Sequence, residues 1–205
     1  MNAAKVGAVS RRAATTILVF AGMTASGKST LAQALAGEYR APYYNTDRVR
    51  KELAGLQVTE RRPDQLKSGI YATDHTEATY QAMLHRARND SALGAELVIL
   101  DGSYSTRRHR EAVRKLAREL GGSAFFVFCH CSDDEVRRRL DQRVKDLEAV
   151  SDGRWDIYMH QKKTFECPDV LEKGQSILLD TQQAVEKMVT DLQTHPFLRG
   201  LLPAR

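Results

Sequence analysis

This chain of 205 residues has few of the features that mark secreted, membrane-spanning or fibrous proteins. Its three cysteines are an odd number without the spacing of a disulfide framework, which favours a reducing cytoplasm over export. No apolar stretch approaches the roughly 20 residues that a membrane-spanning helix needs. The sequence also has no internal repeat, no low-complexity segment and no linker that would separate two domains. We therefore expect a cytoplasmic protein that is not associated with a membrane and folds as one domain.

Two common catalytic motifs are missing as well: the G-x-S-x-G of many hydrolases and the H-E-x-x-H of zinc metalloproteases. The run Cys129-His130-Cys131 would place two thiols on one face of a strand. Structural zinc normally takes four ligands, and no second Cys/His pair lies nearby in sequence, so we expect a buried strand here. The net charge of +5 suits an anionic ligand but is too small by itself to indicate nucleic acid.

The most informative segment present is Thr15–Leu31, TTILVFAGMTASGKSTL. An apolar, β-branched run enters a glycine turn and leaves into a helical pattern that begins at Lys28. Inside it, Gly22–Ser29 forms a complete G-x-x-x-x-G-K-[ST] phosphate loop. Glycines let the backbone N–H groups turn inward around a polyphosphate, and the following helix points its N-terminus at the same anion. The alternative is a chance glycine turn, but strand, loop, Lys-Ser and helix occur in the order that the motif requires.

This loop predicts that the protein binds a nucleoside triphosphate together with Mg²⁺. We expect Lys28 to bridge the β- and γ-phosphates and the Ser29 hydroxyl to ligate Mg²⁺. The residues expected to contact the nucleotide are Gly22, Thr24, Ala25, Ser26, Gly27, Lys28, Ser29 and Thr30.

A second polar group, Asn45 to Arg50, lies at the end of the short strand predicted at 42–46. An aspartate here, Asp47, would face the γ-phosphate and accept a proton from an attacking hydroxyl, as a kinase base must. Arg50 lies one helical turn later and would hold an anionic group of the acceptor or position the carboxylate. The alternative is structural: Asp47 caps the following helix, with Arg50 as its i+3 partner.

The apolar strand at 96–101 ends in a carboxylate, Asp101, followed by Gly102. In phosphate-loop proteins an acid at this position binds Mg²⁺, directly or through water, or contacts the acceptor. Asp-Gly is also common turn chemistry, so a simple strand-end turn is the alternative. We expect Asp101 to serve both the metal and the substrate.

Four arginines lie on the helix predicted after the strand at 124–131, and two of them, Arg139 and Arg143, flank its buried face. The stretch of about 137–165 predicts a lid, with a helix, a polar loop and a second helix. Closing it would bring arginines onto the phosphates and exclude water. A solvated basic helix face is the alternative. We expect Arg139 and Arg143 to be the catalytic arginines.

Strand and helix patterns alternate along the chain, which predicts a parallel sheet covered on both faces. The predicted strands are 16–22, 42–46, 96–101, 124–131 and 176–180, and the predicted helices are 28–37, 47–53, 74–93, 106–120, one capped by Ser132 and Glu135, and one ending near 192. The core residues predicted on two of the helices are Ala78, Ala82, Leu84 and Leu93, then Val136, Leu140, Val144 and Leu147. We expect residues 1–14 to be a flexible leader, 15–194 a single domain, and 195–205 a loosely ordered tail.

These residues together resemble the phosphate-loop kinases that act on small molecules and on polynucleotide 5′-hydroxyls, such as phage polynucleotide kinase, zeta toxins and chloramphenicol phosphotransferase. The resemblance runs from about residue 17 to 181, through GMTASGKST, NTDRVRKEL, VILDGSY, RLDQR and an SDG…Y…Q…FE stretch. It implies a three-layer α/β P-loop NTPase fold with a parallel five-stranded sheet, like nucleoside-monophosphate kinases, and a helical lid. It also implies a general base at Asp47 with Arg50 as its partner, an acid near metal and acceptor at Asp101, and lid arginines at Arg139 and Arg143.

We interpret the chain as an ATP- and Mg²⁺-dependent kinase that phosphorylates a hydroxyl of a small polar metabolite or nucleotide. One alternative is a polynucleotide 5′-hydroxyl kinase. The other is a regulatory switch without an acceptor, which would need no base facing the γ-phosphate. Nucleic acid is not the expected partner, because the sequence has no basic strip with stacking aromatics. Tyr71, Tyr80 and Tyr104 fit a core as well as an acceptor pocket, and the acceptor and oligomeric state stay open.

Overall fold

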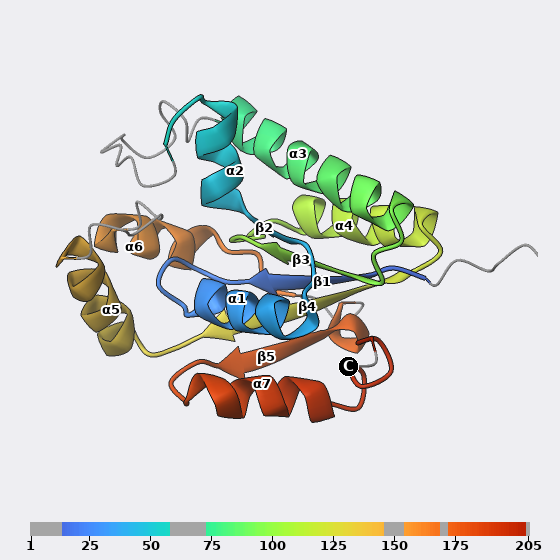
Figure 1. Ribbon diagram of the computed structural model, residues 1–205. Coiled ribbons are helices and arrows are strands. Elements are labelled where there is room, and N and C mark those ends of the chain that lie inside the picture. Colours follow the sequence, from blue (N-terminus) through green and yellow to red (C-terminus); the bar gives the residue numbers. More distant parts are fainter. Residues whose placement is uncertain (1–13, 58–72, 146–153, 169–171, 204–205) are drawn as a thin grey trace, which may run out of the picture.

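The computed structural model describes residues 14–57, 73–145, 154–168 and 172–203, which form strands and helices in alternation (Figure 1). The elements are β1 (Thr16–Ala21), α1 (Lys28–Tyr39), β2 (Tyr43–Asn45), α2 (Thr46–Leu53), α3 (Thr73–Ala92), β3 (Leu97–Asp101), α4 (Arg107–Glu119), β4 (Ser123–His130), α5 (Asp133–Lys145), α6 (Trp155–Thr164), η2 (Lys173–Gln175), β5 (Ser176–Asp180) and α7 (Val185–Thr194). None of the helices in these ranges is long and apolar enough to cross a lipid bilayer. The predicted loop at 56–69 and the centre of the predicted lid lie largely outside the described residues.

The five strands form one parallel sheet in the order β2-β3-β1-β4-β5. The strand order therefore reverses beside β1, and ligands of open α/β sheets bind at the carboxyl edge at such a point. The register places Asn45 beside Asp101, and Asp101 beside Phe20, at this edge. Two strand ends that carry predicted site residues thus lie next to the strand that enters the phosphate loop.

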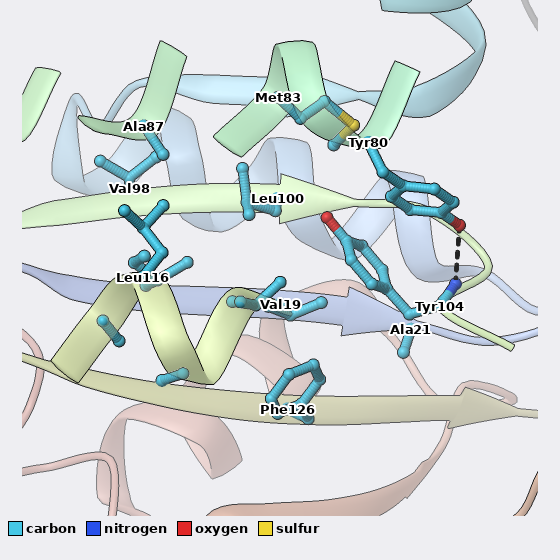
Figure 2. Packing of buried hydrophobic residues seen from close by; sticks show 14 of the residues in the cluster. Val19, Ala21, Tyr80, Met83, Ala87, Val98, Leu100, Tyr104, Leu116 and Phe126 are labelled. Atoms are coloured by element: carbon cyan, nitrogen blue, oxygen red, sulfur yellow. Dashed lines mark hydrogen bonds between the residues drawn. The ribbon is translucent and has the colours of Figure 1, made fainter. Parts of the chain in front are cut away.

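Alternate strand residues build two hydrophobic layers, one on each face of the sheet. Leu18 and Phe20 of β1 pack with α1 and α7 on one face. Ile17 and Val19 pack with α3 and α4 on the other, where Figure 2 shows Val19 between neighbouring strand and helix residues. Every residue of β1 is buried, as expected for a central strand covered on both sides. The predicted α/β class, with its parallel five-stranded sheet, is confirmed.

The core face predicted for α3 is only partly correct. Ala78 is exposed and Leu93 is 86% exposed, whereas Thr79, Tyr80, Met83 and Ala87 form the buried side, and Ala82 and Leu84 lie only at its margin. Two causes explain the error: Leu93 follows the last residue of the helix, and the ring of Tyr80 occupies the core as an aliphatic side chain would. The apolar periodicity of this segment was too weak to fix its rotation.

On α5, Val136 and Leu140 are buried as predicted, but Val144 is 71% exposed. Steps of four residues drift around a helix of 3.6 residues per turn, so Val144 lies about 80° away from Val136. Leu147 lies outside the described residues. The predicted cap of this helix is half formed: the Glu135 N–H donates to the Ser132 hydroxyl at 3.3 Å, but the Glu135 carboxylate turns to arginines instead.

Two segments are more regularly structured or better packed than the sequence predicts. Helix α1 continues through Gly37 to Tyr39 and ends at Arg40, which adopts a left-handed conformation. The segment after His195 packs on the sheet, with Leu198 fully buried and the Thr16 hydroxyl donating to the Leu201 carbonyl at 2.8 Å. The expectation of a loosely ordered tail is therefore corrected for residues 195–203.

Candidate active site

The phosphate loop lies between β1 and α1, at the carboxyl edge of the sheet (Figure 1). Its amides at Ala25, Gly27 and Lys28 have no hydrogen-bond partner among the described residues. The backbone of Ala25 has a left-handed conformation, with φ of 58°, that residues other than glycine rarely adopt. A curved run of unpaired N–H groups beside a helix N-terminus is a binding site for phosphate oxygens. The sequence prediction of the loop's place is confirmed.

Two glycines of the loop are required by their surroundings. Gly22 has a φ of 148°, and a Cβ there would lie 2.5 Å from the Cys129 carbonyl oxygen. Gly27, with a φ of 83°, caps α1, and a Cβ would lie 2.8 Å from both the Arg139 guanidinium and the Thr181 hydroxyl. The glycines therefore allow the loop to curve tightly against β4 and the β5–α7 turn.

Several polar side chains of the loop make few or no hydrogen bonds within the protein. The Lys28 ammonium donates to the Met23 carbonyl at 3.2 Å, and its side chain is half-buried. The hydroxyls of Thr24 and Ser26 are buried and have no hydrogen-bond partner. Ser29 lies half-buried in the first turn of α1, and Thr30 beside it is exposed. The loop thus offers a cation and free hydroxyls around its unpaired amides.

Asp101 is completely buried at the end of β3. Its Oδ2 accepts hydrogen bonds from the Tyr43 hydroxyl at 2.7 Å and from the Asn45 amide at 2.6 Å. Burial and the neighbouring Asp101 carboxylate raise the pKa of Tyr43 well above its usual range, so this donor keeps its proton. Oδ1 has no partner in the described structure. One oxygen is therefore held in place while the other is left for a further ligand, which fits a cation such as Mg²⁺.

Asp47 and Arg50 form an ion pair at the start of α2, with 2.8 Å between Oδ1 and Nη1. Asp47 is not the helix cap, because the Asn45 side chain accepts from the N–H groups of Asp47 and Arg48. The Arg50 side chain is 9% exposed and that of Asp47 is 21% exposed, so the carboxylate stays open to solvent. The structural alternative of an Asp47 cap is wrong, and the i+3 contact with Arg50 is confirmed.

A tyrosine of α3, Tyr80, holds the loop after β3 in place. The Tyr80 hydroxyl lies 3.1 Å from the Ser103 hydroxyl and accepts the Tyr104 N–H at 3.1 Å (Figure 2). Tyr104 has a φ of 43°, a strained conformation for a residue with a large side chain. Both rings are buried in the core, so these tyrosines are core residues whose polar groups shape the segment after Asp101. Tyr71 lies outside the described residues.

Arg139 lies behind the phosphate loop. Its guanidinium donates to the Ala25 carbonyl at 3.2 Å, and to the Thr181 hydroxyl at 3.0 Å and carbonyl at 2.7 Å. Its Nε donates to Glu135 at 2.7 Å, and hydrogen bonds from Arg138 and Arg139 lower the pKa of Glu135 to about 2. Arg139 therefore joins the loop, α5 and the β5–α7 turn. Arg143 lies one turn further along α5, half-buried.

Cys129 in β4 and Cys131, which follows the strand, serve packing. Cys129 lies in the core below α1, and burial raises the pKa of its thiol to about 12. The Cys131 thiol lies 3.9 Å from the Ala25 carbonyl and 3.7 Å from the Arg139 guanidinium. In the part of the chain that the structure describes, no three His, Cys, Asp or Glu side chains cluster as a metal site.

Several residues that shape this site received no predicted role from the sequence: Tyr43 and Asn45, which hold Asp101; Thr181, which holds Arg139; and Gln161, which binds the loop at Thr24. Asn45 and Gln161 entered the sequence analysis only as letters of the family-like segments. Asn45 at a strand end was a visible signal, since Asn is a favoured helix cap. The others act across long sequence separations and carry no local pattern.

The comparisons with known proteins agree with this architecture. A family model described as an AAA domain matches residues 17–168. Two uncharacterized proteins, Mb2027c of Mycobacterium bovis and Rv2004c of Mycobacterium tuberculosis, are 32% identical over 123 residues, which is 60% of this chain. The matched region is only 24% of the length of each of these curated relatives.

Solved structures show the same fold at low sequence identity. A sugar kinase from Janibacter sp. HTCC2649 has a TM-score of 0.64 and 18% identity, covering 93% of this chain and 99% of its own. A gluconokinase from Sinorhizobium meliloti 1021 has a TM-score of 0.58 and 22% identity, covering 88% and 90%. The Mycobacterium tuberculosis APS kinase, in complex with AMPPNP and APS, has a TM-score of 0.57 and 18% identity, covering 87% and 95%.

Proposed function

The chain belongs to the AAA-domain family, a P-loop kinase-like family, and we propose that it is an ATP-dependent phosphotransferase acting on a hydroxyl of a small polar metabolite or nucleotide. The observation that carries the proposal is the pair of carboxylates beside the phosphate loop. Asp47 stays open to solvent at the end of β2, and Asp101 keeps one oxygen unpaired at the end of β3. A nucleotide-binding switch would need no base at the first of these positions.

The loop residues would hold the polyphosphate. The unpaired amides of Ala25, Gly27 and Lys28 and the Lys28 ammonium fit the β- and γ-phosphate oxygens. Ser29 and Asp101 fit Mg²⁺ as hydroxyl and carboxylate ligands. Bound Mg²⁺ would neutralise negative charge on the β- and γ-phosphates.

Asp47 would orient the acceptor hydroxyl and take its proton. Its ion pair with Arg50, at 2.8 Å, fixes the direction of the carboxylate. Arg139, whose contacts lie behind the loop, would support the phosphate site by holding Ala25 in its strained conformation. Arg143, on the part of α5 that belongs to the predicted lid, would supply positive charge to the transferring phosphoryl group.

The class of acceptor is proposed from the structural relatives. They are described as kinases of a sugar, of gluconate and of APS, all small and polar. The proposal therefore names a small polar hydroxyl compound and leaves its identity to experiment.

A screen for ATP consumption tests the proposal. Purified protein would be incubated with Mg·ATP and panels of sugars, sugar acids, nucleosides, aminoglycosides and 5′-hydroxyl oligonucleotides. We expect ADP to form above background with at least one small hydroxyl compound and not with the oligonucleotides. Lys28→Ala protein serves as the matched control for contaminating kinases. ADP formation that is unaffected by every acceptor and equal in this control would contradict the proposal.

A further inference from the structure

The side chain of Gln161 on α6 reaches the phosphate loop. Its Oε1 accepts a hydrogen bond from the Thr24 backbone N–H at 2.7 Å. Because a backbone N–H only donates, the side-chain amide must turn its oxygen to Thr24 and its nitrogen elsewhere. Within residues 14–57, 73–145, 154–168 and 172–203, no other side chain accepts a hydrogen bond from an amide of the loop.

Helix α6 is held against the protein one turn before Gln161. One turn earlier, Tyr158 is 2% exposed and packs with Ala25, Val136 and Leu140 in a small core that includes the phosphate loop. The Tyr158 hydroxyl donates to Asp133 at 2.7 Å. Residues three apart share one face of a helix, so this core aims Gln161 at the loop.

The nitrogen of the Gln161 side chain is free in the described structure, where no hydrogen bond to it is found. The Thr24 hydroxyl does not take it, because Thr24 Oγ1 is buried without any partner. A primary amide nitrogen carries two N–H donors. Loop support alone would need only the oxygen. The nitrogen is not among the buried polar atoms, and Gln161 is half-buried, so the nitrogen is accessible to a ligand.

The Gln161 side-chain amide contacts the loop at Thr24, near the end where the terminal phosphate is expected. Lys28, which in phosphate loops serves the β- and γ-phosphates, donates to the Met23 carbonyl at 3.2 Å. Met23 directly precedes Thr24, so the Lys28 ammonium and the Gln161 side-chain amide bind adjacent residues of the phosphate loop. A neutral donor there can bind a phosphoryl oxygen without opposing the positive charge of Lys28.

We propose that Gln161 positions the terminal phosphoryl group of ATP, with its oxygen holding Thr24 and its nitrogen donating to a γ-phosphate oxygen. This role rests on the proposed kinase function. It makes α6 part of the phosphate site and not only a helix of the predicted lid. It also predicts discrimination between triphosphate and diphosphate, because only the triphosphate reaches the amide.

Calorimetric titration of Mg·AMPPNP and Mg·ADP tests this without knowledge of the acceptor. Gln161→Glu keeps an oxygen for Thr24 but replaces the donor by a negative charge, and Gln161→Met removes both contacts. We expect AMPPNP affinity to fall about tenfold or more in Gln161→Met, the contribution of one hydrogen bond to a charged group, and further in Gln161→Glu. ADP affinity should stay at the wild-type value in Gln161→Glu. Lys163→Met, an exposed change on the same helix, should bind both nucleotides normally.

The outcomes distinguish γ-phosphate binding by Gln161 from simple support of the loop. They also distinguish failure of this proposal from failure of the proposed function. Wild-type AMPPNP affinity in Gln161→Glu would overturn the proposal, because only the oxygen would then matter. Equal losses for AMPPNP and ADP in that variant would also overturn it, by showing a deformed loop. Thermal unfolding checks each variant, and if Gln161→Met does not fold, Gln161→Glu alone decides. Wild-type protein that binds neither nucleotide would instead contradict the proposed function.

Discussion

The Lys28 side chain contacts the phosphate loop and not the hydrophobic core, since its ammonium donates to the Met23 carbonyl. Lys28→Ala should therefore abolish phosphoryl transfer while leaving the unfolding temperature close to that of wild type. Activity with an identified acceptor and a thermal melt of the same sample measure the two effects. Unchanged turnover in the purified variant would refute the assignment of the loop.

Asp47 should act on the acceptor and not on the nucleotide. Asp47→Asn should lower turnover by about 10²–10⁴-fold, the usual contribution of a positioned base, with ATP affinity nearly unchanged. Asn45 caps α2 and keeps that role in the variant, so the fold should tolerate the change. A loss of ATP binding together with a lower unfolding temperature would show instead that Asp47 is structural.

At the scale of single residues, the sequence predicted those whose chemistry is tied to a local motif. The phosphate loop, Asp47 with Arg50, and Asp101 all follow strand ends, and parallel strands bring such ends to one edge. Tyr43 and Gln161 could not be found this way. Their partners lie 58 and 137 residues away, and only the folded sheet brings them together.

At the scale of elements, buried strands were the most reliable predictions, because continuous apolar runs leave few alternatives. Helix rotation was less reliable. The buried face of α3 carries Thr79 and Tyr80, and no alternation of polar and apolar residues indicated it. Packing against α2, α4 and β3 decides that face, and none of these contacts is visible in a short window of sequence.

The contact between α3 and α4 should make stability depend on pH. The His109 ring stacks on Tyr80 at 4.0 Å and lies 3.4 Å from Glu77, and burial lowers the His109 pKa below 6.5 despite that carboxylate. The unfolded chain then binds more protons than the folded one as pH falls through this range, so the free energy of unfolding decreases. Urea unfolding at neutral and mildly acidic pH measures the slope. His109→Gln should reduce it, and an identical slope in both proteins would contradict the expectation.

At the scale of the whole molecule, the charge distribution argues against a nucleic-acid partner. The net charge is only +5, and exposed arginines pair with acids, as in Arg118 with Glu111 and Arg88 with Glu119. We expect no measurable binding of a single-stranded 5′-hydroxyl oligonucleotide near physiological ionic strength. Fluorescence anisotropy at several salt concentrations measures it. Tight binding with a salt slope of about three or more phosphates would favour a polynucleotide kinase.

Phosphorus NMR of a complete reaction tests the central claim most directly, because it follows where the γ-phosphate goes. The sample holds wild-type protein, Mg·ATP and the acceptor that gives the strongest response in the screen. The account predicts equal amounts of ADP and a new phosphomonoester of that small molecule, and neither product with Lys28→Ala. ADP accompanied only by inorganic phosphate would contradict it, because the protein would then hydrolyse ATP without transferring the phosphoryl group.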